Sequence, residues 1–240
     1  MNKLWVILFL FALPLAGCES ARQILNTVGT NTNGAGILSN AEIVQGLKEA
    51  LRVGADTTTK RLSILNGFFG DDMIRILMPP EAQKVEKTLR DVGFGKTVDK
   101  AILSMNRAAE DATKFVGDIL WNSIKNMSFQ DALGVLRGGD FAATEYLKRT
   151  TTQQLIIAFR PVIERSLQNV NATKYWNDVF SVYNKFSSNP VNTDLPAYVT
   201  EKTLSGLFYH IGLQEQKIRK DPVARVTDIL KRVFGSNYHL

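Results

Sequence analysis

Apolar residues beyond position 39 recur at steps of three and four, which is the period of a helix that buries one face. The clearest run covers residues 97–126, where apolar side chains, many of them alanine, fill the a, d and e positions of successive heptads. This pattern predicts one long helix with a closely packed neighbour, because alanine lets helices approach. The same period predicts further helices over residues 39–54, 57–65, 79–92, 128–137, 140–149, 150–167, 175–186, 199–220 and 222–233.

Local signals refine this helical pattern. Ser39 and Glu42 have the spacing of a capping box at the first helix, and Pro161 falls inside residues 150–167, where it should bend the helix. Ile74, Ile76 and Met78 alternate with Arg75 and Leu77, which favours an extended conformation over residues 73–78, but the sequence predicts no second strand to pair with them. The predicted fold is therefore all-α, a single multi-helix, bundle-like domain over residues 39–240.

The first 38 residues have a different character. Residues 1–17 carry a basic start, an apolar run too short to span a bilayer and small residues at the end, which is typical of a signal peptide. The lone cysteine, Cys18, follows Leu-Ala-Gly in a pattern that resembles the bacterial lipoprotein box, so we expect cleavage between Gly17 and Cys18 and acylation of Cys18. Residues 18–38 then comprise the lipidated cysteine and a flexible tether rich in Gly, Asn and Thr.

Acylation of Cys18 determines the expected location. Two or more acyl chains hold a protein stably at a bilayer, whereas a single chain binds reversibly. Glu19 stands where an aspartate would favour retention at the inner membrane. We therefore expect a lipoprotein of the bacterial cell envelope, attached to the membrane through Cys18, anchored at the outer membrane and facing the periplasm.

The amino-acid composition limits the kinds of site that the chain can form. Of 240 residues, 45% are hydrophobic and 22% are charged, as expected for a globular protein rather than a disordered one. A single cysteine excludes a disulfide framework and a cysteine-based zinc site, and two histidines leave little for another metal centre. We therefore expect no metal and no cofactor. The formal net charge is +6, and the favoured interpretation of the basic segment 217–232 is a solvated helix face. As a binding surface it fits anionic lipid head groups better than nucleic acid, which we do not expect as a partner.

Three features that suggest chemistry have simpler structural interpretations. Residues 93–97 resemble the end of a phosphate-binding loop, but Arg90 replaces its first glycine and a helix precedes it, so we predict a helix stop and restart. His210 lies beside the apolar face of its helix and pairs with no nucleophile, which favours a structural histidine. Helical spacing predicts a solvated ladder of ion pairs among Arg107, Glu110, Asp111 and Lys114.

Several short phrases together resemble a known family. They include Leu-Ser-Asn-Ala-Glu-Ile at 38–43, Met-Asn-Arg-Ala-Ala-Glu at 105–110, Gly-Asp-Phe-Ala-Ala-Thr at 139–144 and Val-Phe-Gly at 233–235. With the lipoprotein box, they are similar to the bacterial lipoprotein family catalogued as domain of unknown function 4197, over residues 38–235. The resemblance implies a helical envelope domain, transfers no catalytic residue, and marks a candidate polar cluster made of Asn106, Arg107, Glu110, Asp140, Thr144, Glu215 and Arg219.

The expected function is that of a non-enzymatic envelope lipoprotein, a membrane-tethered helical module that binds a protein partner or an apolar, lipid-like ligand. A second hypothesis is a periplasmic hydrolase that uses carboxylates such as Glu110, Asp140 and Glu215, which requires two of them to converge in a pocket. A third hypothesis is a structural spacer between membrane and cell wall. The position of the carboxylates relative to cavities separates the first hypothesis from the second.

Overall fold

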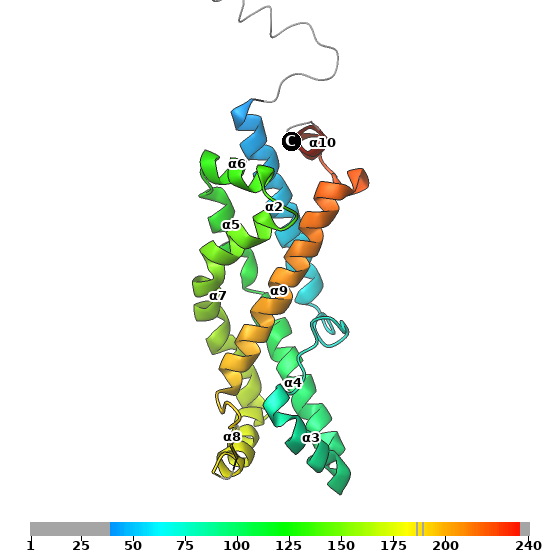
Figure 1. The fold of residues 1–240 in the computed structure, drawn as a ribbon, viewed down its shortest axis with the longest axis vertical. Coiled ribbons are helices and arrows are strands. Elements are labelled where there is room, and N and C mark those ends of the chain that lie inside the picture. Colours follow the sequence, from blue (N-terminus) through cyan, green and yellow to red (C-terminus); the bar gives the residue numbers. More distant parts are fainter. Residues whose placement is uncertain (1–38, 186, 189, 236–240) are drawn as a thin grey trace, which may run out of the picture. The chain divides into compact units, whose positions relative to one another are not determined.

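The computed structural model describes residues 39–185, 187–188 and 190–235, and these residues form helices and their connections without a β-strand (Figure 1). The prediction of an all-α domain is confirmed. Several predictions lie outside the described residues, namely the signal peptide 1–17, cleavage between Gly17 and Cys18, acylation of Cys18 and the tether 18–38. The same holds for residues 236–240.

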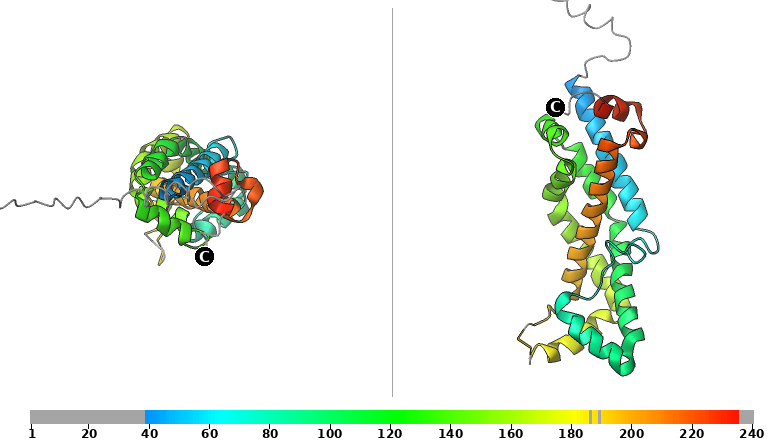
Figure 2. Two further views of the ribbon diagram at one scale, coloured as in Figure 1. Left: turned by 90° about the horizontal axis from the view of Figure 1, so that it is seen from above. Right: turned by 45° about the vertical axis from the view of Figure 1, so that its right-hand side comes forward.

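Helix α9 (Leu195–Lys220) packs against the other three long helices, α2 (Asn40–Leu62), α4 (Gly95–Thr113) and α7 (Ala142–Asn169). Figure 1 shows α9 between α7 and α4, and Figure 2 shows from another side that it runs next to α2. The shorter helices are α3 (Gln83–Leu89), α5 (Val116–Lys125), α6 (Phe129–Arg137), α8 (Ala172–Tyr183) and α10 (Asp228–Gly235). Short 3₁₀ turns cover Pro80–Ala82 and Pro222–Ala224.

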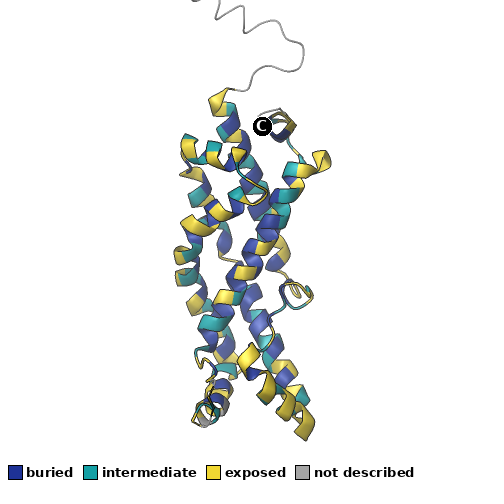
Figure 3. Cartoon of the chain, in the orientation of Figure 1, coloured by how far each residue is buried: buried dark blue, intermediate teal, exposed yellow. Residues whose placement is uncertain are grey.

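The core lies where the long helices face one another, as the dark blue surfaces of Figure 3 show. Leu47 of α2, Phe159 of α7 and Leu207 of α9 are all almost completely buried. Burial of such side chains stabilises a fold by about 25 cal/mol per Å² of apolar surface. The predicted close neighbour of the alanine-rich helix is confirmed, since α7 packs against α4 and three alanines of α4 have no exposed surface: Ala108, Ala109 and Ala112.

Four predicted helix boundaries are wrong. The helix predicted over 222–233 begins only at Asp228, after the 3₁₀ turn Pro222–Ala224. Residues 39–54 and 57–65 belong largely to one helix, α2, which continues to Leu62. The predicted helix 97–126 is interrupted after Thr113, and Phe115, which the heptad pattern assigns to the apolar face, is 54% exposed. Residues 140–149 and 150–167 merge into α7, which continues through Pro161.

The merger within α7 has a local cause. The sequence predicts a new helix cap at Thr150, Thr151 and Thr152, but each hydroxyl donates to the carbonyl oxygen four residues earlier, at 2.6–2.8 Å. A hydroxyl that bonds back to the preceding turn is satisfied without ending the helix. These threonines are therefore interior helix residues.

Close contact between α10 and α2 leads to a first prediction, at Gly46. A methyl group added there would overlap the side chain of Val233, whereas a methyl group at Gly134, on the exposed side of α6, would meet nothing within 4 Å. We expect Gly46→Ala to lower the free energy of unfolding by about 1–3 kcal/mol through overpacking. Gly134→Ala should raise it by up to about 1 kcal/mol through helix propensity. Urea denaturation checks both, and equal gains in the two variants would contradict this packing.

Candidate functional site

The residues of the predicted polar cluster fall into two separate groups. One group lies on α4, where Asn106, Arg107 and Glu110 face the connection between α2 and α3. The other lies where α9 meets the start of α7, and it comprises Thr144, Glu215 and Arg219, with Asp140 on the surface nearby. The structure thus brings the residues together within each group but does not join all seven.

Glu110 is the centre of the first group. Its side chain is 4% exposed, and its Oε1 atom accepts hydrogen bonds from the backbone N–H groups of Phe68 (3.1 Å) and Phe69 (3.2 Å). Its Oε2 atom pairs with Nη1 of Arg107 at 2.5 Å, and Arg107 also donates to the side chain of Asn66 at 2.8 Å. The carboxylate therefore holds the connection after α2 against α4.

The prediction of a solvated ladder is wrong for Glu110. Helical spacing places Glu110 near Arg107 and Asp111 near Lys114, but only the second pair, at 2.8 Å, has both side chains about half exposed. Glu110 is buried because residues 63–79 cross α4 at this point and supply two backbone donors. A charge taken out of water needs such partners, since its desolvation costs several kcal/mol.

The side chain of Asn106 makes backbone hydrogen bonds that a neighbouring β-strand would otherwise make. The buried Asn106 side chain accepts from the N–H of Ile76 at 2.8 Å and donates to the carbonyl of Ile76 at 2.8 Å. Ile74 and Ile76 are buried while Met73 and Leu77 are exposed, so the alternation seen in the sequence corresponds to alternating burial. The described residues nevertheless offer this segment no β-strand partner, and the amide of Asn106 satisfies its backbone.

Glu215 is the centre of the second group. Its side chain is 7% exposed, and it accepts from the backbone N–H groups of Ala143 (2.9 Å) and Thr144 (2.8 Å) and from the hydroxyl of Thr144 (2.8 Å). Arg219 donates to it through Nε (2.9 Å) and Nη2 (2.8 Å), and also to the carbonyl of Val135 at 2.7 Å. A carboxylate at this place satisfies N–H groups that the first turn of α7 leaves without helical partners.

Asp140 differs from these buried groups. Its exposed carboxylate pairs with Lys220 and lies 3.5 Å from the side-chain nitrogen of Gln216. The hydrogen bond from Lys220 lowers the pKa of Asp140 below its usual value. Glu215 borders a cavity of about 20 Å³, a space for about one water molecule. The carboxylates of this group therefore neutralise neighbouring cations and cap a helix, and they do not converge on a substrate-sized cavity.

His210 belongs to a buried polar contact that the sequence did not reveal. Its Nε2 atom lies 3.0 Å from Oδ2 of Asp71, which also pairs with Arg61 at 2.9 Å, while its Nδ1 atom has no hydrogen-bond partner among the described residues. Burial lowers the pKa of His210, and the charge of Arg61 lowers it further, against the opposing effect of Asp71. Burial alone would raise the pKa of Asp71, but a bond from the N–H of Met73 and the charges of His210 and Arg61 lower it.

These shifts predict a loss of stability on mild acidification. The folded-state pKa of His210 lies below its unfolded value of about 6.5, so the unfolded chain binds the proton first. The stability that the neutral form of His210 contributes to the fold is fully present above pH ~6.5. It is lost as the pH falls through the folded-state pKa. We therefore expect the urea concentration at the midpoint of unfolding to fall when the pH is lowered from about 7.5 to about 5.5, roughly one unit on either side of the unfolded pKa. The fall should be smaller in His210→Gln. Equal pH dependence in the parent and in His210→Gln would contradict the assignment of this effect to His210.

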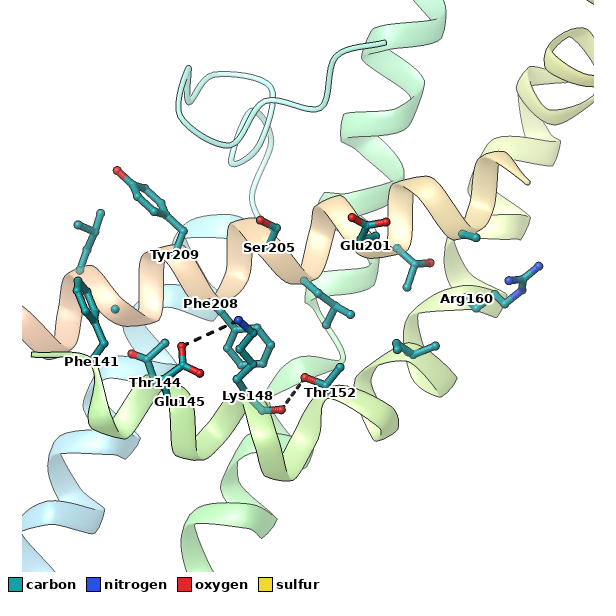
Figure 4. Close-up of a pocket in the computed structure, with 16 residues that line it drawn as sticks. Phe141, Thr144, Glu145, Lys148, Thr152, Arg160, Glu201, Ser205, Phe208 and Tyr209 are labelled. Carbon is teal, nitrogen blue, oxygen red and sulfur yellow. Dashed lines mark hydrogen bonds and ion pairs between the residues drawn. The ribbon is translucent and has the colours of Figure 1, made fainter. Parts of the chain in front are cut away.

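One cavity is a groove between α7 and α9, the α7–α9 groove, with a volume of about 660 Å³ (Figure 4). Half of its sixteen lining residues are polar or charged, and its charges are mostly paired: Lys148 lies 4.0 Å from Glu145, and Arg160 pairs with Glu164 and Asp194. Figure 4 shows Lys148 and Glu145 pointing toward each other. The groove is therefore an open, amphipathic surface with the lining residues Phe141, Thr144, Glu145, Lys148, Thr152, Ile156, Arg160, Ala197, Thr200, Glu201, Leu204, Ser205, Phe208, Tyr209, Gly212 and Leu213.

A second cavity, which we call the α3–α4–α8 cleft, is far more apolar. Its volume is about 390 Å³, and fourteen of its eighteen lining residues are apolar. The rings of Trp176 and Phe180 are tilted by 48° with centroids 4.4 Å apart, and the Trp176 Nε1–H donates to the carbonyl of Asn192 at 3.0 Å. The lining residues are Met78, Ala82, Val85, Glu86, Leu89, Thr97, Val98, Lys100, Ala101, Leu103, Ser104, Met105, Val170, Ala172, Tyr175, Trp176, Phe180 and Leu195.

Other kinds of site find no support in the part of the chain that the structure describes. There, no group of three or more histidine, cysteine, aspartate or glutamate residues is placed to hold a metal ion. Within the same residues, every helix is too short or too polar to cross a bilayer.

Comparison with known proteins gives one match. The model of a family described as protein of unknown function (DUF4197) matches residues 37–235. The curated proteins contain no match to the chain, and neither do the solved structures.

Proposed function

The chain belongs to the DUF4197 family, and from that premise we propose that it is a non-enzymatic lipoprotein of the bacterial cell envelope that binds an apolar, lipid-like ligand. The ligand would occupy the α3–α4–α8 cleft. The membrane anchor would be an acylated Cys18, at the outer membrane and facing the periplasm. The observation that carries the proposal is the apolar lining of the cleft.

The size and chemistry of the cleft support an apolar ligand. A volume of about 390 Å³ falls within the range of about 300–1,000 Å³ that is typical of small-molecule pockets, which are mostly apolar with a few polar groups. The aromatic rings of Trp176 and Phe180 form part of the wall, and Tyr175 is 59% exposed beside them. Transfer of each methylene group from water into such a site is worth about 0.8 kcal/mol.

The buried carboxylates favour binding over the alternative of hydrolysis. A hydrolase of the kind considered needs two carboxylates that face each other across a pocket. Glu110 and Glu215 each accept from two backbone N–H groups and pair with an arginine. Both therefore have partners without a substrate, and neither lines the α3–α4–α8 cleft or the α7–α9 groove.

The direct test is saturable binding of a dansylated fatty acid. The full chain, reconstituted in nanodiscs of phosphatidylcholine, should transfer excitation from tryptophan to the bound dansyl group, because Trp176 lines the cleft. Native mass spectrometry of the chain released from membranes should find a co-bound lipid-like molecule. Absence of saturable transfer above that of empty nanodiscs, together with a ligand-free mass, would refute the proposal.

A further inference from the structure

We infer that the ligand of the α3–α4–α8 cleft is a single-chain amphiphile with an anionic carboxylate head group, and that Lys100 binds that head group. The inference rests on the proposed function and adds the class of ligand. It follows from the charges at the cleft, the polar side chains along α4 and the size of the apolar space.

One cation lines the cleft, the exposed side chain of Lys100. Among its lining residues, the charged ones are Glu86 and Lys100. Glu86 pairs with Arg90 at 2.9 Å, and Arg90 also pairs with Asp99 at 2.8 Å, so one arginine serves two carboxylates. Lys100 has no ion-pair partner among the residues that the structure describes. Lys100 is therefore the lining cation that can pair with an anionic head group.

The polar groups of the cleft lie together on α4. Thr97, Lys100 and Ser104 follow one another at steps of three and four, which places them on one face of this helix. The Ser104 hydroxyl donates to the carbonyl of Lys100 at 2.7 Å, and its oxygen remains able to accept. A carboxylate beside Lys100 would thus meet a cation and hydroxyl groups at the polar edge of α4.

The rest of the cleft suits an aliphatic chain. Opposite the polar edge, the walls come from α3 and α8 and include Val85, Leu89 and Trp176. Its volume of about 390 Å³ lies near the lower end of the range for ligand pockets, about 300–1,000 Å³. A space of that size favours one chain over the two chains of a phospholipid.

A comparison of a charged ligand with an uncharged one tests the inference. Dodecanoate and dodecanol would compete against the dansylated fatty acid on the full chain in phosphatidylcholine nanodiscs at pH above ~7, where carboxylates are ionised. We expect Lys100→Gln to weaken dodecanoate binding by about 1.5-fold to fivefold, the range for an exposed ion pair, and to leave dodecanol unchanged. Added salt should reduce the difference. The matched control is Lys96→Gln, since Lys96 is an exposed lysine of the same helix that does not line the cleft.

The possible outcomes separate the two proposals. If dodecanoate and dodecanol bind equally and Lys100→Gln affects neither, the inference is overturned while binding of apolar ligands stands. If Lys96→Gln weakens dodecanoate as much as Lys100→Gln, the effect is general surface attraction and the assignment of Lys100 fails. A two-chain phosphatidylglycerol that displaces the probe better than dodecanoate would overturn the single-chain ligand. If no probe binds saturably, the proposed function itself fails, and the inference with it.

Discussion

Replacing Glu215 by alanine should lower the free energy of unfolding by about 3–5 kcal/mol, the usual effect of removing one partner of a buried ion pair. The substitution leaves Arg219 without its carboxylate and leaves the N–H groups of Ala143 and Thr144 without an acceptor. For a domain of this size, each kcal/mol corresponds to about 2–4 °C, so the melting temperature should fall by roughly 10 °C. Thermal and urea denaturation measure the change.

The matched control for Glu215→Ala lies on the same helix. Glu201 is exposed on α9 and lines the α7–α9 groove, and no ion pair holds it among the described residues. Glu201→Ala should change the free energy of unfolding by no more than about 0.5 kcal/mol. Glu215→Gln, which keeps an acceptor oxygen but removes the charge, should fall between the two alanine variants. If Glu215→Ala costs no more than Glu201→Ala, the buried contact does not support the fold.

The same arrangement occurs twice in the structure. At each place a buried glutamate accepts two backbone N–H groups from a distant segment and pairs with an arginine close to it on its own helix. Glu110 fixes the connection after α2 to α4, and Glu215 fixes the start of α7 to α9. The two buried glutamates hold segments in place whose position does not follow from the periodic apolar pattern of the helices.

Hydrophobic period was sufficient to predict the helices, because each helix buries one face and the period of that face is local. It failed where the deciding contact is distant in sequence. Glu110 has the spacing of an exposed ion pair with Arg107, and only the N–H groups of Phe68 and Phe69, more than forty residues away, explain its burial. The prediction of a helix cap at Thr150–Thr152 was wrong for a local reason. A hydroxyl can cap a new helix, or it can donate to the preceding turn of the helix that already contains it.

The α3–α4–α8 cleft could not be predicted from the sequence. Val85, Ala101 and Trp176 lie on separate predicted helices, and each residue has the spacing of an ordinary core position. A period shows which face of a helix is apolar, but it does not show whether the facing helices close the space between them. The apolar faces of α3, α4 and α8 leave about 390 Å³ open, and that gap is a property of their tertiary arrangement.

Filling this space should weaken ligand binding strongly. Ala101 is a partly exposed residue of α4 that lines the cleft, so Ala101→Trp would place an indole ring in the apolar space. If the ring displaces four methylene groups of a bound chain, the loss is about 3 kcal/mol, or roughly 100-fold in affinity. The measurement is the concentration at which the dansylated fatty acid saturates energy transfer from tryptophan. Val85→Trp, on the opposite wall, should have the same effect.

A tryptophan placed in the other cavity provides the control. Ser205 is an exposed residue of α9 that lines the α7–α9 groove (Figure 4), so Ser205→Trp adds the same ring to a different surface. It should leave the affinity unchanged, and all three variants should keep the helical circular dichroism of the parent because each position is partly or fully exposed. Loss of binding in Ser205→Trp, with binding retained in Ala101→Trp and Val85→Trp, would transfer the ligand site to the groove. Retention in all three would leave the apolar cleft without a role in binding.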